Sequence, residues 1–120
     1  MDELVRRLVA TVGIDSAVAE KSVGIILQFL LKEGPADKVQ ALLDRLPGSA
    51  AALQTADAGG GGVFSMGGVM GAGTRLMGLG LGMSQVQAVT REVIGYARET
   101  IGEDAVGEIV GAIPGLGQFV

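Results

Sequence analysis

Residues 37–48 read DKVQALLDRLPG, and residues 104–115 read DAVGEIVGAIPG. The two stretches carry the same Asp, Val, Pro and Gly at matching places, and aliphatic residues match between them. In each stretch the apolar residues recur at the i, i+3, i+4 and i+7 spacing of one helix face. The Asp lies in the first turn, where the helix dipole favours it, and the Pro-Gly ends the helix. We therefore predict two related short amphipathic helices.

The similarity extends upstream of both stretches. Val12-Gly13-Ile14-Asp15 corresponds to Leu81-Gly82-Met83-Ser84, which predicts that a helix ends at a glycine and that Asp15 or Ser84 caps the next helix. Each unit then has three helices. The six predicted helices span residues 2–12, 16–32, 36–46, 66–79, 84–101 and 103–113.

The predicted fold class is all-α: a helical bundle of two related three-helix units joined by a glycine-rich linker. The first unit and a short extra helix occupy residues 1–58, the linker residues 59–65 and the second unit residues 66–120. The linker begins with four consecutive glycines, a composition typical of flexible connections. Hydrophobic residues make up 48% of the chain but aromatic residues only 3%, so we expect an aliphatic core of packed helices.

Composition argues against several classes of function. The net charge is −4 and basic residues are not clustered, so a nucleic-acid interface is not expected. The chain has no Cys and no His, which removes cysteine nucleophiles, the commonest general base and the commonest transition-metal ligand. The serines therefore lack a histidine to activate them, and the carboxylates are dispersed. We predict no catalytic residue, no cofactor, no metal site and no small-molecule substrate, and hence no enzyme. Because the N-terminal residues do not resemble a secretory signal, we expect a cytoplasmic protein.

The glycine-rich segment 63–83 holds seven glycines and one charge, Arg75. A membrane span of this length is disfavoured by the arginine, and a phosphate-binding loop by the absence of lysine. We favour a helix whose small residues allow another helix to approach closely, either within the chain or between chains. The candidate interface residues on this helix are Gly67, Met70, Gly71, Leu76 and Met77.

The second unit also resembles a known family. Gly82-Met83-Ser84, the pair Gln87-Ala88 and the closing segment from Val106 to Gly115 resemble the VcgC/VcgE-type bacterial domain of unknown function. The resemblance covers residues 63–117. It implies a small helical fold and a bacterial origin, but no activity and no functional residues.

The sequence thus predicts a non-enzymatic interaction or scaffold module that self-associates as a homo-oligomer or binds a protein partner. A membrane-associated or lipid-binding protein acting through residues 63–83 is the first alternative. A carrier of a small apolar ligand, with a pocket between the two units, is the second.

Overall fold

The fold is helical throughout the part of the chain described by the computed structural model, which is residues 2–46, 48, 68–113 and 115–118. The predicted all-α class is therefore confirmed, and the helices begin and end within two residues of their predicted positions. The elements are α1 (Asp2–Val12), α2 (Ser16–Glu33), α3 (Ala36–Asp44), α5 (Gly68–Met77), α6 (Met83–Ile101), α7 (Glu103–Ala112) and the short 3-10 helix η1 (Leu116–Gln118). The predicted linker 59–65 lies outside the described residues.

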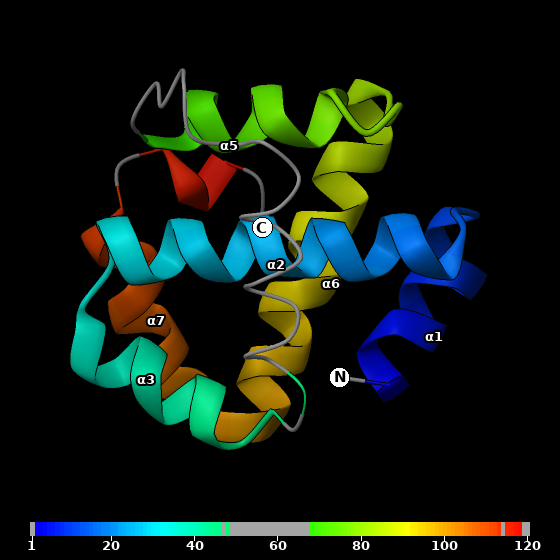
Figure 1. Cartoon of the computed structure of the whole chain (residues 1–120). Coiled ribbons are helices and arrows are strands. Elements are labelled where there is room, and N and C mark those ends of the chain that lie inside the picture. Colours follow the sequence, from blue (N-terminus) through cyan, green and yellow to red (C-terminus); the bar gives the residue numbers. More distant parts are fainter. Residues whose placement is uncertain (1, 47, 49–67, 114, 119–120) are drawn as a thin grey trace.

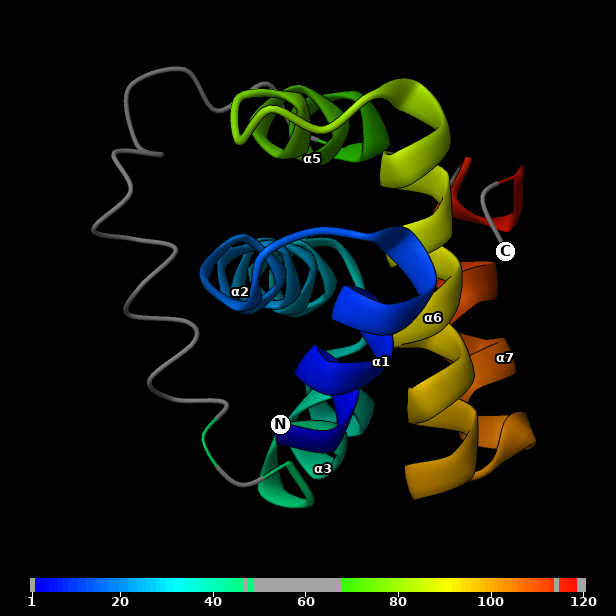
Figure 2. The same ribbon diagram turned by 90° about the vertical axis from the view of Figure 1, so that its right-hand side faces the viewer.

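Helix α2 crosses the centre of the molecule (Figure 1). Helix α5 lies on one side of α2 and α3 on the opposite side, an arrangement that is clear after a quarter turn (Figure 2). The long helix α6 runs beside this stack and contacts α1, α2, α3, α5 and α7. Helices α1 and α7 lie on opposite sides of α6 in both views. Each short helix therefore packs on one or both of the two long helices.

A single aliphatic cluster forms the core and draws residues from every α-helix. In α2, every residue from Ser22 to Leu27 is buried, and this helix contacts α1, α3, α5 and α6. The buried hydroxyl of Ser22 donates to the carbonyl of Val18, its own helix turn, at 2.7 Å. In α6, the buried hydroxyl of Thr90 likewise donates to the carbonyl four residues earlier, at 2.9 Å. Both polar groups thus enter the core with their hydrogen bonds satisfied.

The junction before α6 differs from the sequence prediction. Ser84 does not cap this helix, because α6 begins at Met83 with Gly82 in the N-cap position. The side chain of Gln85 reaches back, and its Oε1 accepts the Gly82 N–H at 2.9 Å. Leu81 is buried at 6% exposure and fixes where the chain enters the helix. The start of α6 therefore depends on the buried side chain of Leu81 and on the hydrogen bond of Gln85 to the backbone, and not on Ser84.

Positions 67 residues apart have matching structural roles in the two parts of the chain. Gly13 and Gly80 both have positive φ, 78° and 95°, and precede the long helices α2 and α6. Gly48 and Gly115 both have positive φ, 90° and 86°, after α3 and α7. The upstream match of Gly13 with Gly82 was therefore two residues off. Buried aliphatic positions follow the same spacing: Val39 and Val106, Leu42 and Ile109, Leu46 and Ile113.

Candidate functional site

The predicted interface residues fall in and around α5, but they do not share one exposed face. Gly67 lies outside the described residues, and nothing is described of the Met70 side chain. Gly71 is buried, and Leu76 is 1% exposed and belongs to the core. Met77 is 40% exposed. Of these residues, Met77 offers an apolar side chain to solvent.

Two exposed apolar side chains lie where α5 turns into α6, Met77 at the end of α5 and Met83 at the start of α6. We call Met77, Leu79 and Met83 the apolar corner. Met77 and Met83 are 40% and 55% exposed, and Leu79 is partly buried against the core. Sequence reasoning missed Met83, although the alternation of glycine and large apolar residues over 77–83 is a signal that a turn displays such residues.

The apolar corner is held by its backbone. The N–H of Leu79 donates to the Leu76 carbonyl at 3.0 Å, and the N–H of Gly80 donates to the Met77 carbonyl at 2.9 Å. Leu76 and Leu81, on either side of the turn, are buried at 1% and 6% exposure. The corner is thus anchored at both ends, and its methionines adapt readily to an irregular partner surface because their side chains are unbranched and flexible.

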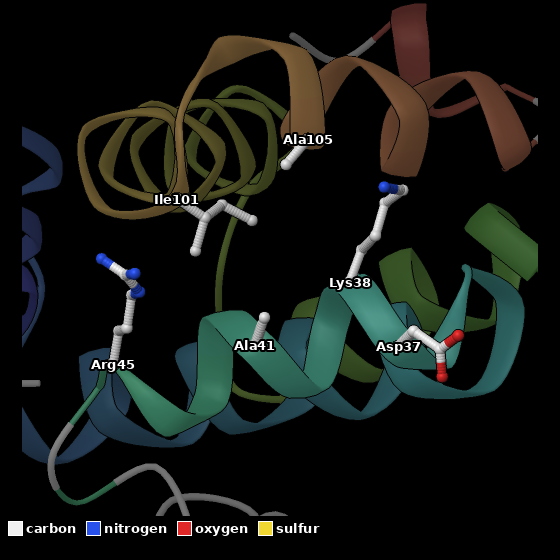
Figure 3. A pocket seen from close by; sticks show the side chains of 6 residues that line it. All are labelled: Asp37, Lys38, Ala41, Arg45, Ile101 and Ala105. Carbon is white, nitrogen blue, oxygen red and sulfur yellow. The ribbon is translucent and has the colours of Figure 1, made fainter.

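A hollow of about 400 Å³ lies between α3 and the junction of α6 with α7 (Figure 3). Ala41, Ile101 and Ala105 form its apolar middle, and the side chains of Lys38 and Arg45 stand toward its two ends. The small side chains of the two alanines leave the space between the helices unfilled. Asp37 also lines the hollow, on the α3 side.

The cations beside this hollow are engaged within the chain. The ammonium of Lys38 forms an ion pair with the Glu108 carboxylate of α7. The Arg45 guanidinium donates to the carbonyl of Thr100, near the C-terminal end of α6, at 3.4 Å. A cation suits that position, because the carbonyl end of a helix carries partial negative charge. The hollow is therefore a gap in the packing between these helices, and the ion pair of Lys38 and the hydrogen bond of Arg45 join the helices at its edge.

A second polar cluster joins α1 to α6. The Arg7 guanidinium contacts both carboxylate oxygens of Glu99, at 2.6 and 3.1 Å, and also lies 3.4 Å from the Glu3 carboxylate. The guanidinium carbon lies 5.2 Å from the centre of the Tyr96 ring, within cation–π range. The hydrogen bond from Arg7 lowers the pKa of the Glu99 carboxyl, and the same bond raises the pKa of Arg7. Such a bidentate pair fixes orientation more than it adds stability at an exposed site.

The described residues contain no cluster of three or more acidic, His or Cys side chains suited to a metal ion. Among the same residues, no buried side-chain nitrogen or oxygen lacks a hydrogen-bond partner. No helix in the described part of the chain is long and apolar enough to cross a membrane. Comparison with family models, with curated proteins and with solved structures gives no match. The resemblance to the VcgC/VcgE-type domain stays a prediction.

Proposed function

We propose that this protein is a non-enzymatic helical interaction module, built from two related three-helix units, which self-associates through the apolar corner. The observation that carries the proposal is the exposure of Met77 and Met83 at one anchored turn. Burying these side chains, with Leu79, against a second copy removes apolar surface from water, the main driving force of association.

The relation between the two units is supported by the constant spacing of 67 residues. The starts of α2 and α6 are that far apart, and so are the starts of α3 and α7. Four of the five positive-φ glycines among the described residues follow the same spacing, Gly13 with Gly80 and Gly48 with Gly115, and so do the buried aliphatic positions. The fifth, Gly102, has Pro35 at the matching position. Chance similarity between amphipathic helices accounts for a shared apolar stripe, but not for shared backbone conformations at the turns.

A non-enzymatic role is supported by the state of the polar groups. Ser22 and Thr90, the buried polar residues of the described core, are bonded to their own helices. Arg7 and Glu99 are bonded to each other at the surface, and neither lines the hollow beside α3. Catalytic sites instead bring groups with shifted pKa values together in a cleft.

The proposal is tested by light scattering across the micromolar concentration range. We expect the wild-type chain to form an oligomer and the double variant Met77→Ser, Met83→Ser to be a monomer with unchanged helix content. Val9→Ser is the matched control, because Val9 is a similarly exposed residue (38%) on a different helix, α1. A wild-type chain that is monomeric throughout the range contradicts self-association.

The same variants separate the two alternatives. If the apolar corner binds lipid, the wild-type chain sediments with phosphatidylcholine vesicles and the double methionine variant does not. If the protein carries an apolar ligand, an extractable lipid or hydrocarbon copurifies with it and is unaffected by the methionine changes. Either result without self-association contradicts the proposed function.

A further inference from the structure

The core of this protein is shared between the two ends of the chain. We call residues 2–46 the first half and residues 68–118 the second half. Helix α1 of the first half packs against α6 of the second, and α5 of the second half packs against α2 of the first. Leu4 and Leu8 of α1 are fully buried, and Leu76 of α5 is 1% exposed. Each half therefore depends on the other to bury its leading helix.

Polar contacts make the interface between the halves specific. Arg7 of the first half pairs with Glu99 of the second, and Lys38 pairs with Glu108. Arg45 of the first half donates to a carbonyl of the second. In all three contacts the positive group belongs to the first half and the acceptor to the second. This arrangement of charge favours contact between a first half and a second half, and disfavours contact between two copies of the same half.

We propose that this interface also forms between two chains, the second half of one chain packing on the first half of another in a reciprocally exchanged dimer. The partner is a second copy of this protein, and every contact of the monomer recurs in the exchanged form. This interface is distinct from the apolar corner, so the inference does not depend on the proposed function.

The balance between the two forms is set by the chain that joins the halves. Residues 45–67 connect α3 to α5, which lie on opposite sides of α2 (Figures 1 and 2). The sequence of this connection contains four consecutive glycines, a composition that predicts a flexible linker, and such a linker gives the two halves an effective concentration on the order of millimolar. At micromolar concentration the closed form of each chain is therefore favoured over the exchanged form, and exchange becomes appreciable when chains refold together near the millimolar range.

The hollow seen in Figure 3 is a place where the two halves are loosely packed. Between α3 and the α6–α7 junction, Ala41 and Ala105 leave a hollow, and the ion pair of Lys38 with Glu108 bridges it. An exposed ion pair contributes little stability, so this side of the interface opens more readily than the closely packed aliphatic side.

The exchange is tested in the full chain, which has no native cysteine. Arg7→Cys chains are mixed with Glu99→Cys chains, unfolded in urea, refolded together at about 1 mM and treated with a short bis-maleimide. Because residues 7 and 99 lie on opposite halves and contact one another, we expect a covalent product that contains one chain of each variant. The control mixes Arg7→Cys with Asp104→Cys, a change in α7, and the helix α7 lies on the other side of α6 from α1 (Figure 2). It gives little or no such product.

A second variant shifts the balance. Deleting residues 51–66 leaves five residues between Leu46 and Gly68, with a reach of about 20 Å. This is less than the smallest dimension of the molecule, 25 Å, and α3 and α5 lie on opposite sides of α2. We expect a dimer by light scattering at micromolar concentration, also when Met77→Ser and Met83→Ser are present. If the deletion prevents folding, the mixed-variant experiment decides.

The inference is overturned if the refolded mixture yields no more product than the control. It is also overturned if the shortened chain is folded, as judged by circular dichroism, yet monomeric. A cross-linked product together with a wild-type chain that is monomeric at micromolar concentration contradicts the proposed function and leaves the exchange intact.

Discussion

Two glycines in α7 offer a test in which the structure sets the sign of the effect. Gly107 and Gly111 lie in the interior of α7 on its exposed side, and a Cβ added at either meets no atom within 4 Å. Glycine in a helix interior costs about 0.5–1 kcal/mol relative to alanine, because the unfolded chain loses more conformational freedom. Each Gly→Ala change therefore stabilises the protein by about that amount.

The expected gain is large enough to measure. Small domains have unfolding free energies of about 5–15 kcal/mol, so the Gly107→Ala, Gly111→Ala double variant gains on the order of a tenth of the total. For a chain of this length, about 1 kcal/mol raises Tm by roughly 4 °C. Urea unfolding followed by helix circular dichroism gives the free energy directly. An increase in the midpoint at unchanged m value is the expected result.

Gly102, immediately before α7, is the matched control. Its φ and ψ of 97° and 156° are a conformation that other residues rarely adopt, although a Cβ there also meets open space. Gly102→Ala therefore destabilises the fold by about 1–3 kcal/mol. If Gly107→Ala lowers the stability, or if Gly102→Ala raises it, the reasoning from local geometry is refuted. A loss at position 107 would indicate that something outside the chain packs closely on this face.

Three further changes test the core, a close approach and an ion pair. Leu27→Ala empties a fully buried site in α2, and we expect the unfolding free energy measured in urea to fall by about 2–5 kcal/mol. Gly34→Ala places a Cβ 2.8 Å from the Leu30 carbonyl oxygen, and a loss of about 1–3 kcal/mol is expected on the same assay; a neutral result contradicts the close approach. The pKa of the Glu99 carboxyl is lowered in the folded chain because Arg7 donates to it. The pair therefore stabilises the fold at pH values above the pKa of the unfolded chain, about 4.3, and this stabilisation is lost as the pH falls through the pKa of the folded chain. Glu99→Gln should therefore lower the midpoint of urea unfolding near neutral pH, but lower it much less at about pH 3. An equal decrease at both pH values is evidence against the pair.

The helices were predictable because their signals are local. The apolar spacing in residues 37–46 and 104–113, bounded by an acid and a Pro-Gly, specifies α3 and α7 without reference to the rest of the chain. The start of α6 was misplaced, since it depends on the burial of Leu81 and on the side chain of Gln85. The burial of Leu81 appears only when the other helices are in place, whereas the hydrogen bond of Gly82 to Gln85 is a local signal that the prediction overlooked.

The site was harder to predict for a physical reason. Leu76 and Met77 are adjacent apolar residues, and sequence reasoning gave them the same role. The structure buries one at 1% exposure and leaves the other at 40%, because the turn after α5 decides which side faces the core. The pairing of Arg7 with Glu99 was equally invisible, since the two residues are 92 positions apart. Neither a helix period nor a motif encodes which distant surfaces meet.

The continuous burial of α2 from Ser22 to Leu27 limits which substitutions the chain tolerates. From Ser22 to Leu27 no position faces solvent, so neither a larger nor a more polar side chain is accommodated there. At the corresponding point α6 presents Arg91 to water, and substitution at that position is cheap. A saturation mutagenesis library should therefore be depleted across this six-residue block of α2 and permissive at Arg91.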